Sequence, residues 1–298
     1  MQLNNYVIKK FIIYILLIII QGSCVDTSQI IDTNVSEKLF VLCEIRSGTP
    51  VIADISFTGT GSGVRPITTD DLDKLNVGIL RKDNGEFLPL TFDQNMKKFT
   101  IDSSLIDFYP GEEYELVLSR FGFGPEVRSS ISVPEPIKIQ DIIVSRYDTL
   151  KTDDQKVKTI VHCSISFERP VQLPAYFHVI ARTPEGMEFK AGKFFGSVSA
   201  FTNMKKTEGF LVDYSRTGGN TIAIEWSVTD FKAHDIIHLE FCNVKEQYYR
   251  FLLFTDGIRQ WPEGNPENPG IIPLNINSTG IIGSFHALTP THHIFKIK

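Results

Sequence analysis

Several motifs that would assign a reaction are missing from this chain of 298 residues. It has no Gly-x-Ser-x-Gly nucleophile motif and no His-Glu-x-x-His pair, which mark serine hydrolases and zinc proteases. The glycine-rich residues 59–63 lack the Gly-Lys-Ser/Thr ending of a phosphate-binding loop, so we interpret them as a flexible connection. Two acids that meet only in the fold could still cleave a glycoside. We therefore expect a protein that is not an enzyme and carries no cofactor, with a hydrolase as the least favoured alternative.

The chain also lacks an excess of positive charge. Its 30 Lys and Arg residues face 35 Asp and Glu residues, which gives a net charge of −5 at pH 7. Nucleic-acid binding requires a basic face, and electrostatic adhesion to anionic lipid requires basic clusters. The composition therefore argues against nucleic acid as a partner and against electrostatic attachment to a membrane surface.

Cysteine is scarce, with four residues in the chain. Cys43, Cys163 and Cys242 lie in apolar, strand-like segments, and their spacing fits no zinc motif. Three thiols cannot all pair, so an oxidising compartment would allow one disulfide among them. Buried free thiols are the alternative that the apolar surroundings favour, because cysteine packs as a small hydrophobic side chain.

Two groups of side chains contain potential metal ligands. His238 and Cys242 are an even number of residues apart in one predicted strand and share a face of it, where His162 of another strand could join them. The acids between Asp70 and Asp73 could bind calcium, but no calcium-loop pattern surrounds them. For both groups we favour the simpler interpretation. The histidines and the thiol then have unrelated roles, the acids lie in a solvated loop or at the start of a short helix, and we expect no metal site.

Long apolar runs are absent except near the N-terminus. Residues 11–20 form an apolar run behind Lys9 and Lys10, about half the length that a membrane-spanning helix needs. A basic start, a short apolar core and small residues before the cleavage site are typical of a signal peptide. We therefore predict that residues 1–23 are a cleaved signal peptide and that no helix of the mature chain spans a membrane.

Cys24 directly follows Gly22 and Ser23 at the predicted cleavage site. This arrangement resembles the lipobox of bacterial lipoproteins, in which the cysteine is acylated and becomes the first residue. Gln21 stands where a strict lipobox has leucine, whereas relaxed Bacteroidota boxes often end in Ser-Cys. We predict lipidation at Cys24, with palmitate and related acyl chains attaching the protein to the outer membrane of the cell envelope, on its periplasmic or its surface face. The alternative is an ordinary secretory signal followed by a chance cysteine.

The rest of the chain predicts a mainly β protein. Residues 24–37 are polar and lack periodicity, and we interpret them as a tether. Short apolar runs then recur between turn residues, which is the pattern of β-sandwiches. The Pro-Glu-Pro sequence at residues 134–136 interrupts backbone hydrogen bonding and marks the best internal boundary. We predict two β-sandwich-like, immunoglobulin-like units: an N-terminal sandwich over residues 38–133 and a β-rich C-terminal domain over residues 134–298.

Two local signals add detail to this layout. Asn84-Gly85 lies between two apolar runs and predicts a β-hairpin, because both residue types tolerate positive φ. One short C-terminal helix is predicted near residues 243–257. Asn243 resembles its N-cap, with Glu246 three residues on, and apolar residues follow at helical spacing.

Aromatic residues near this helix are the candidates for ligand binding. Tyr248, Tyr249 and Trp261, together with Trp226, could stack on a sugar ring. We take the first three as speculative binding residues. The alternative is that these rings pack in the core.

Several segments, taken in order, resemble one family of envelope proteins. They are Leu-Phe-Val-Leu-Cys-Glu-Ile at 39–45, Pro-Gly-Glu-Glu-Tyr-Glu-Leu at 110–116, Val-Pro-Glu-Pro-Ile at 133–137, Tyr-Tyr-Arg-Phe at 248–251, Asn-Pro at 265–266, Pro-Leu-Asn-Ile-Asn-Ser-Thr-Gly at 273–280 and Ile-Gly-Ser-Phe at 282–285. From Cys24 to its end the chain resembles the Bacteroidota lipoproteins known as domain of unknown function 4249. His234-Asp235 and the Gly-Ser-Phe sequence at 283–285 depart from the family pattern.

This resemblance implies a lipid-anchored accessory or binding protein that works with an outer-membrane TonB-dependent receptor, because family members are often encoded beside such receptors. Similarity at the level of fold does not fix function, and the alternative is a stand-alone carbohydrate- or peptide-binding module. A module should present an exposed aromatic platform, and an accessory protein should present an apolar patch. An enzyme should bring two acids with shifted pKa values into one cleft.

Overall fold

The computed structural model describes residues 38–58, 64–102, 104–121, 126–151, 157–170, 173–195, 200–205, 208–229, 236–256, 275–277 and 281–296. The predicted signal peptide, Cys24, the predicted tether and Trp261 lie outside these ranges, so the expectations about them remain predictions. Within the described ranges, no helix is long and apolar enough to cross a membrane.

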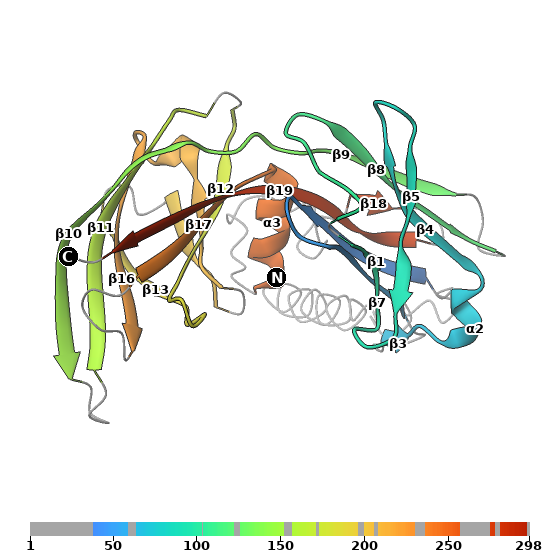
Figure 1. The fold of residues 1–298 in the computed structure, drawn as a ribbon, viewed down its shortest axis with the longest axis horizontal. Helices are drawn as coiled ribbons and strands as arrows, with labels where there is room; N and C mark the ends of the chain where they lie inside the picture. Colours follow the sequence, from blue (N-terminus) through green and yellow to red (C-terminus); the bar gives the residue numbers. More distant parts are fainter. Residues whose placement is uncertain are drawn as a thin grey trace, which may run out of the picture.

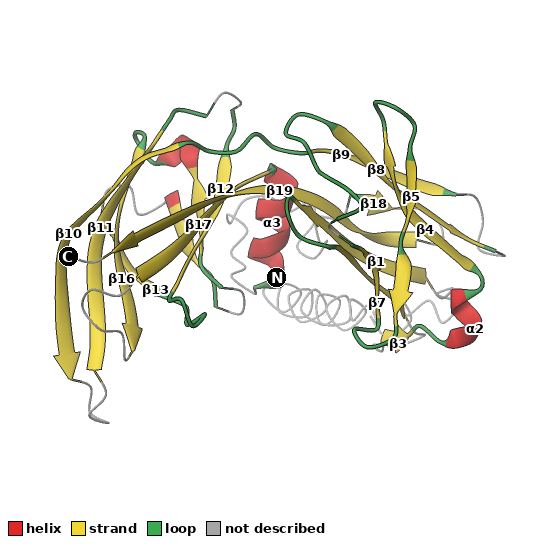
Figure 2. Cartoon of the chain, in the orientation of Figure 1, coloured by secondary structure: helices red, strands yellow, loops and turns green. Residues whose placement is uncertain are grey.

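The described chain is mainly β, as the sequence predicts, with 61% strand and two helices (Figure 2). The central sheet contains, in spatial order, β14 (Phe201–Asn203), β15 (Phe210–Asp213), β12 (Tyr176–Arg182), β17 (Ile236–Val244), β19 (Ile281–Lys296), β1 (Lys38–Arg46), β2 (Val51–Thr58), β7 (Lys98–Ile101) and β6 (Thr91–Asp93), with β18 (Ile276–Asn277) beside β19 and β3 (Val64–Pro66) beside β2. The two outer sheets are β5 (Phe87–Pro89), β4 (Leu75–Arg81), β8 (Glu113–Arg120) and β9 (Val127–Ser132), and β10 (Ile139–Lys151), β11 (Val157–Phe167), β16 (Thr221–Thr229) and β13 (Lys190–Phe195). The helical segments are α2 (Thr69–Leu72), α3 (Glu246–Thr255) and the short 3-10 helix η3 (Tyr214–Arg216).

The central sheet depends on strands that alternate in burial. In β1, Leu39, Val41, Cys43 and Ile45 are buried, whereas the residues between them are partly exposed. Successive side chains of a strand point to opposite faces, so one face of β1 is apolar and belongs to a core. β1 pairs in parallel with β19 and antiparallel with β2. The first and last described strands of the chain therefore lie side by side (Figure 1).

The central sheet contributes to two separate hydrophobic cores. The first core lies between β1 and β2 and the outer sheet of β4, β8 and β9, and it includes Phe57, Ile79 and Tyr114. The second lies between β12 and β17 and the outer sheet of β11 and β16, and it includes Phe167 and Trp226. This packing of sheets is consistent with a β-sandwich arrangement. Figure 1 shows the two outer sheets at opposite ends of the molecule.

One strand, β19, takes part in both cores. Its residues Ile281, Phe285 and Ala287 are buried in the first core, and Phe295 packs against the second. These odd-numbered residues share one face of the strand. The end of the chain thus completes the core of the N-terminal strands, while the two outer sheets fall on either side of the predicted boundary at residues 134–136.

The Pro-Glu-Pro segment is hydrogen-bonded to the central sheet. The Thr289 hydroxyl donates to the carbonyl oxygen of Pro134 at 2.6 Å, and the Asn243 side-chain amide donates to that of Glu135 at 2.7 Å. These side chains satisfy carbonyl groups in a segment that belongs to no strand. The segment is therefore fixed against β17 and β19.

The predicted hairpin and helix are both present. β4 and β5 pair antiparallel around the predicted turn, in which Gly85 has a φ of 72°. Helix α3 lies within residues 243–257, but the prediction that Asn243 is its N-cap is wrong. Asn243 belongs to β17, Lys245 occupies the N-cap, and no side chain caps the helix. Pairing of Asn243 with both β12 and β19 extends the strand past the capping signal.

We predict that Gly283→Ala destabilises the protein. A Cβ at Gly283 would lie 2.0 Å from the backbone carbonyl oxygen of Val41, which belongs to its partner residue in β1. The two strands must separate to admit it, so the free energy of unfolding should fall by about 1–3 kcal/mol or more in urea denaturation. Gly219→Ala is the matched control, because a Cβ there meets nothing within 4 Å. Equal unfolding midpoints for the two variants would contradict the close spacing of β1 and β19.

Candidate functional site

The two predicted binding tyrosines are neighbours in α3 but take different positions. Tyr248 is buried, and its hydroxyl donates to Glu44 Oε2 at 2.6 Å. Tyr249 is half-buried, with its ring 4.6 Å from that of Tyr176. The two rings therefore do not form a common exposed surface. Trp226, by contrast, has 0% exposure in the second core.

The residues considered as metal ligands are not brought together. His162 lies on β11 of an outer sheet, near Asp148 and Glu225. His238 and Cys242 lie on β17 of the central sheet, where His238 is exposed and Cys242 is buried. Among the residues that the structure describes, no group of three or more His, Cys, Asp or Glu side chains is arranged to hold a metal ion.

The cysteines of the described chain are buried free thiols. Cys43, Cys163 and Cys242 are unpaired with one another. Burial raises the pKa of Cys163 to about 12 and also raises those of Cys43 and Cys242. Because the thiolate is the reactive form, these thiols are poor nucleophiles at neutral pH.

The acids near residue 70 form part of a short helix. The carboxylate of Asp71 accepts hydrogen bonds from the backbone N–H of Thr68 at 3.0 Å and from its hydroxyl at 2.7 Å, which completes a capping box. The other carboxylate oxygen pairs with buried Arg120 at 2.9 Å. Asp71 is thus committed to structure, in agreement with the predicted start of a short helix.

Ionisable side chains gather between α3 and the face of the central sheet opposite the two cores. They line a hollow of about 220 Å³. We name them the α3 cluster: Glu44, Arg46, His178, Arg182, Glu208, Glu240, Cys242 and Tyr248. They come from β1, β12, β17, α3 and the segment before β15, so only the fold brings them together.

Ion pairs connect the charged members of the α3 cluster. Arg46 contacts Glu240, which lies 3.9 Å from Arg182. Arg182 also contacts Glu208, and Nε2 of His178 lies 2.7 Å from the carbonyl oxygen of Glu208. A carbonyl oxygen only accepts, so Nε2 of His178 carries the proton.

Burial favours the neutral forms of the remaining members. It raises the pKa of Glu44, and the hydrogen bond from Tyr248 offsets only part of this increase. It also lowers the pKa of His178 and raises those of Cys242 and Tyr248 well above their ordinary values. These directions follow from the hydration that the charged forms lose.

The α3 cluster has the chemistry of a structural contact. Shifted pKa values often mark functional sites, but a catalytic thiol needs a lowered pKa, whereas that of Cys242 is raised. Glu44, whose raised pKa would suit a general acid, is hydrogen-bonded to Tyr248. We interpret the cluster as the polar contact that fixes α3 on the sheet.

Sequence reasoning missed this cluster, although a signal is present. Glu240 stands between buried Leu239 and Phe241 in β17. Glu44 and Arg46 likewise alternate with core residues in β1. Charges at alternate positions usually indicate a solvated strand face, and only the position of α3 shows that this face is covered.

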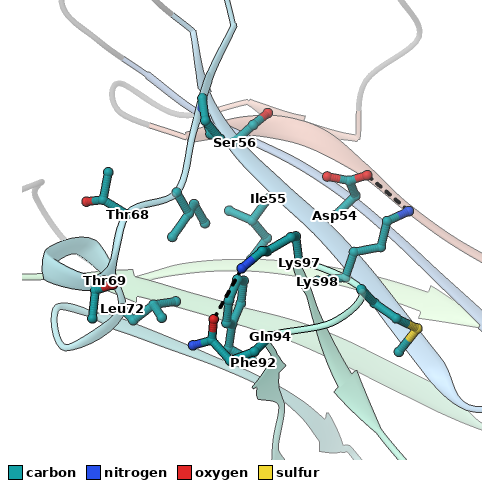
Figure 3. Close-up of a pocket in the computed structure, with 13 residues that line it drawn as sticks. Asp54, Ile55, Ser56, Thr68, Thr69, Leu72, Phe92, Gln94, Lys97 and Lys98 are labelled. Atoms are coloured by element: carbon teal, nitrogen blue, oxygen red, sulfur yellow. Dashed lines mark hydrogen bonds and ion pairs between the residues drawn. The ribbon is translucent and has the colours of Figure 1, made fainter.

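A second hollow lies where strands diverge from β2. On the edge away from β1, β2 pairs with β7 through Val51–Ala53 and with β3 through Ser56–Thr58. Between these two pairings, at Asp54 and Ile55, a hollow of about 770 Å³ opens. We name it the fork hollow. Figure 3 shows that its side chains come from β2, from the segment before α2, from α2, and from β6, β7 and the turn between them.

The fork hollow has an apolar floor and a charged rim. Ile55, Leu72 and Phe92 line it together with hydroxyl-bearing side chains such as Thr69. At the rim, Lys98 pairs with Asp54 at 3.2 Å. Nζ of Lys97 donates to the side-chain oxygen of Gln94 at 3.4 Å. This mixture of an apolar interior and a few polar groups is typical of ligand pockets.

An open strand edge is the third candidate. β10 has 13 residues, about twice the usual strand length, and β11 is the only described strand that pairs with it. Ile143, Tyr147 and Leu150 of β10 are exposed at 53%, 37% and 51%. The register places Ile143 and Leu150 opposite Ser164 and Lys158 on the outer face.

Tyr147 lies on the other face of β10, opposite the core residue Val161. The change of face follows from an irregularity in the ladder between Val144 and Arg146. Exposed apolar groups therefore flank the edge on both faces. We name this strand with its three exposed apolar residues the β10 edge.

Comparison of the chain with protein-family models and with curated proteins finds no match.

Glu44→Gln should reduce the pH dependence of stability. Burial raises the pKa of Glu44 in the folded protein above its ordinary value of 4.5, so the folded state holds this proton more tightly than the unfolded state does. The resulting stabilisation is complete below about pH 4.5 and is lost as the pH rises through the raised pKa. Over that interval, the urea midpoint of the variant should fall less than that of the wild type.

The control for this measurement is Glu168→Gln. The Glu168 side chain is 52% exposed and pairs with Lys138 at 3.5 Å. We expect this variant to keep the wild-type pH dependence. A Glu44→Gln variant with the same pH profile as wild type would contradict the raised pKa of Glu44.

Proposed function

We propose that this protein is a lipid-anchored protein of the cell envelope that binds a protein partner at the β10 edge. The family resemblance supports an outer-membrane TonB-dependent receptor as this partner. In this proposal the two halves of the fold are immunoglobulin-like sandwiches that act as a rigid support. The protein contributes recognition and position, and it performs no reaction of its own.

The anchoring part of the proposal rests on the N-terminal sequence. An apolar run, two small residues and Cys24 coincide within one short segment, as in lipoprotein precursors. Each buried methylene of an acyl chain contributes about 0.8 kcal/mol, so two or three chains hold a protein stably on a membrane. The net charge of −5 offers no electrostatic substitute for such an anchor.

The binding part of the proposal rests on the β10 edge. An edge strand exposes a row of backbone N–H and C=O groups that can pair with a strand of another protein. In such strand addition the backbone supplies affinity and alternate side chains supply specificity. Ile143 and Leu150 on one face and Tyr147 on the other would then contact the partner on both sides of its added strand.

The alternative function is a stand-alone carbohydrate- or peptide-binding module. The fork hollow is the observation that favours it, because its volume of about 770 Å³ suits a small ligand. A hydrolase is a weaker alternative, because the carboxylates of the α3 cluster are held in ion pairs and in a contact with Tyr248.

Cys24→Ala should abolish incorporation of labelled palmitate in cells that make the full chain. The thiol is the acylated group, so the variant should also move from the membrane fraction to the soluble fraction. Ser23→Ala, which keeps a small residue before the cysteine, should remain labelled. Undiminished labelling of Cys24→Ala would refute the lipoprotein assignment.

Charges placed on the β10 edge should release the partner. We expect the double variant Ile143→Lys, Leu150→Lys to recover at least about tenfold less partner in a mild-detergent pull-down read by mass spectrometry, because buried ammonium groups oppose apolar contact. Circular dichroism should show an unchanged strand signal.

The matched control is Ile294→Lys, at an isoleucine of β19 that is 65% exposed. It should retain wild-type recovery. Equal loss in both variants would contradict a role specific to the β10 edge. Recovery of the wild-type protein without any partner would contradict the accessory function and favour the binding module.

A further inference from the structure

The fork hollow contains apolar surface that the described chain leaves partly uncovered. Ile67, Leu72 and Phe92 belong to the margin of the first core, and each is only partly buried. They line the hollow together with Ile55 and with Met96, which is 47% exposed. Partly exposed aliphatic and aromatic groups in a concave site gain free energy when a ligand covers them.

The rim adds a positive charge to this apolar surface. Asp54, Lys97 and Lys98 are the charged residues of the lining, which leaves one cation in excess. Lys98 is paired with Asp54 at 3.2 Å, whereas the hydrogen-bond acceptor of Lys97 is the neutral amide of Gln94. The ammonium of Lys97 is therefore the group of the rim best placed to pair with a ligand.

The charge of the residues that line the hollow is opposite in sign to that of the whole chain, whose net charge is −5. The negative charge of the protein as a whole disfavours an anion, so the attraction of an anion to the hollow must come from nearby cations.

The short distance between β3 and β7 along β2 limits the kind of ligand that the hollow can hold. Only Asp54 and Ile55 separate the two pairings, which is too short for an added strand.

We propose that the fork hollow binds an amphipathic organic anion, a small molecule with an apolar body and one carboxylate. The apolar body lies against Ile55, Leu72 and Phe92, and the carboxylate pairs with Lys97. Figure 3 shows these side chains around one space. This site is separate from the β10 edge, so its test does not depend on the partner.

Lys97 also offers a variant that removes charge without weakening the fold. Its φ of 57° lies in the left-handed region, which glycine adopts more readily than lysine does. Lys97→Gly should therefore unfold at a temperature equal to or above that of the wild type. A loss of binding in this variant cannot be attributed to loss of structure.

The test uses three probes with the same apolar body: 4-phenylbutyrate, 4-phenylbutan-1-ol and 4-phenylbutylamine. Binding to the full chain in lipid nanodiscs is measured by calorimetry, with empty nanodiscs as the blank. We expect the carboxylate to bind about two- to fivefold more tightly than the alcohol, as a half-exposed ion pair allows. The amine should bind most weakly, and high salt should reduce the differences.

Variants locate the site. Lys97→Gly should remove the preference for the carboxylate, whereas Lys138→Gln, at a lysine whose side chain is 75% exposed, should retain it. Thr69→Trp fills the hollow from an exposed position and should weaken binding of every probe at least about tenfold.

Four outcomes would overturn the proposal: no binding of any probe, equal affinity for the acid and the alcohol, tightest binding of the amine, or unchanged binding in Thr69→Trp.

Discussion

The parallel pairing of β1 with β19 is the constraint on which the rest of the structure depends. Leu39 pairs with Ile281 and Arg46 with Leu288, so strands from opposite ends of the described chain form the middle of the central sheet. Bringing together two strands that are so far apart in the sequence costs conformational entropy. Burial of the apolar faces of both strands offsets this cost. Gly283 permits the close approach, because no side chain there separates it from the backbone of Val41.

The same pairing decides where polar groups can gather. One face of the central sheet is used by the two cores, and α3 covers part of the opposite face. Charged groups on that face must then be paired or neutral, because burial without a partner is costly. Arg46 with Glu240 and Tyr248 with Glu44 meet this requirement. Among the described strands, pairing stops at the fork of β2 and along the outer edge of β10. These are the two places proposed for binding.

The proposed anchor and the proposed partner edge are compatible in one chain. A tether over residues 24–37 would reach at most about 50 Å when fully extended. In the proposed arrangement, this length would keep the β-rich body close to a membrane-embedded partner. The proposed partner edge and the proposed ligand hollow lie on different strands, β10 and β2, so a ligand and a partner could be bound together.

The sequence by itself determined the mainly β class, the hairpin at Gly85 and the position of the short helix, because these follow from local periodicity and turn chemistry. It misplaced the start of that helix at Asn243, where strand pairing extends β17. Tertiary structure alone decided that β19 serves two cores and that Glu44 lies beneath Tyr248. It also decided that His162 and Cys242 lie in different sheets. Each of these depends on contacts between residues far apart in the chain, and no local pattern encodes such contacts.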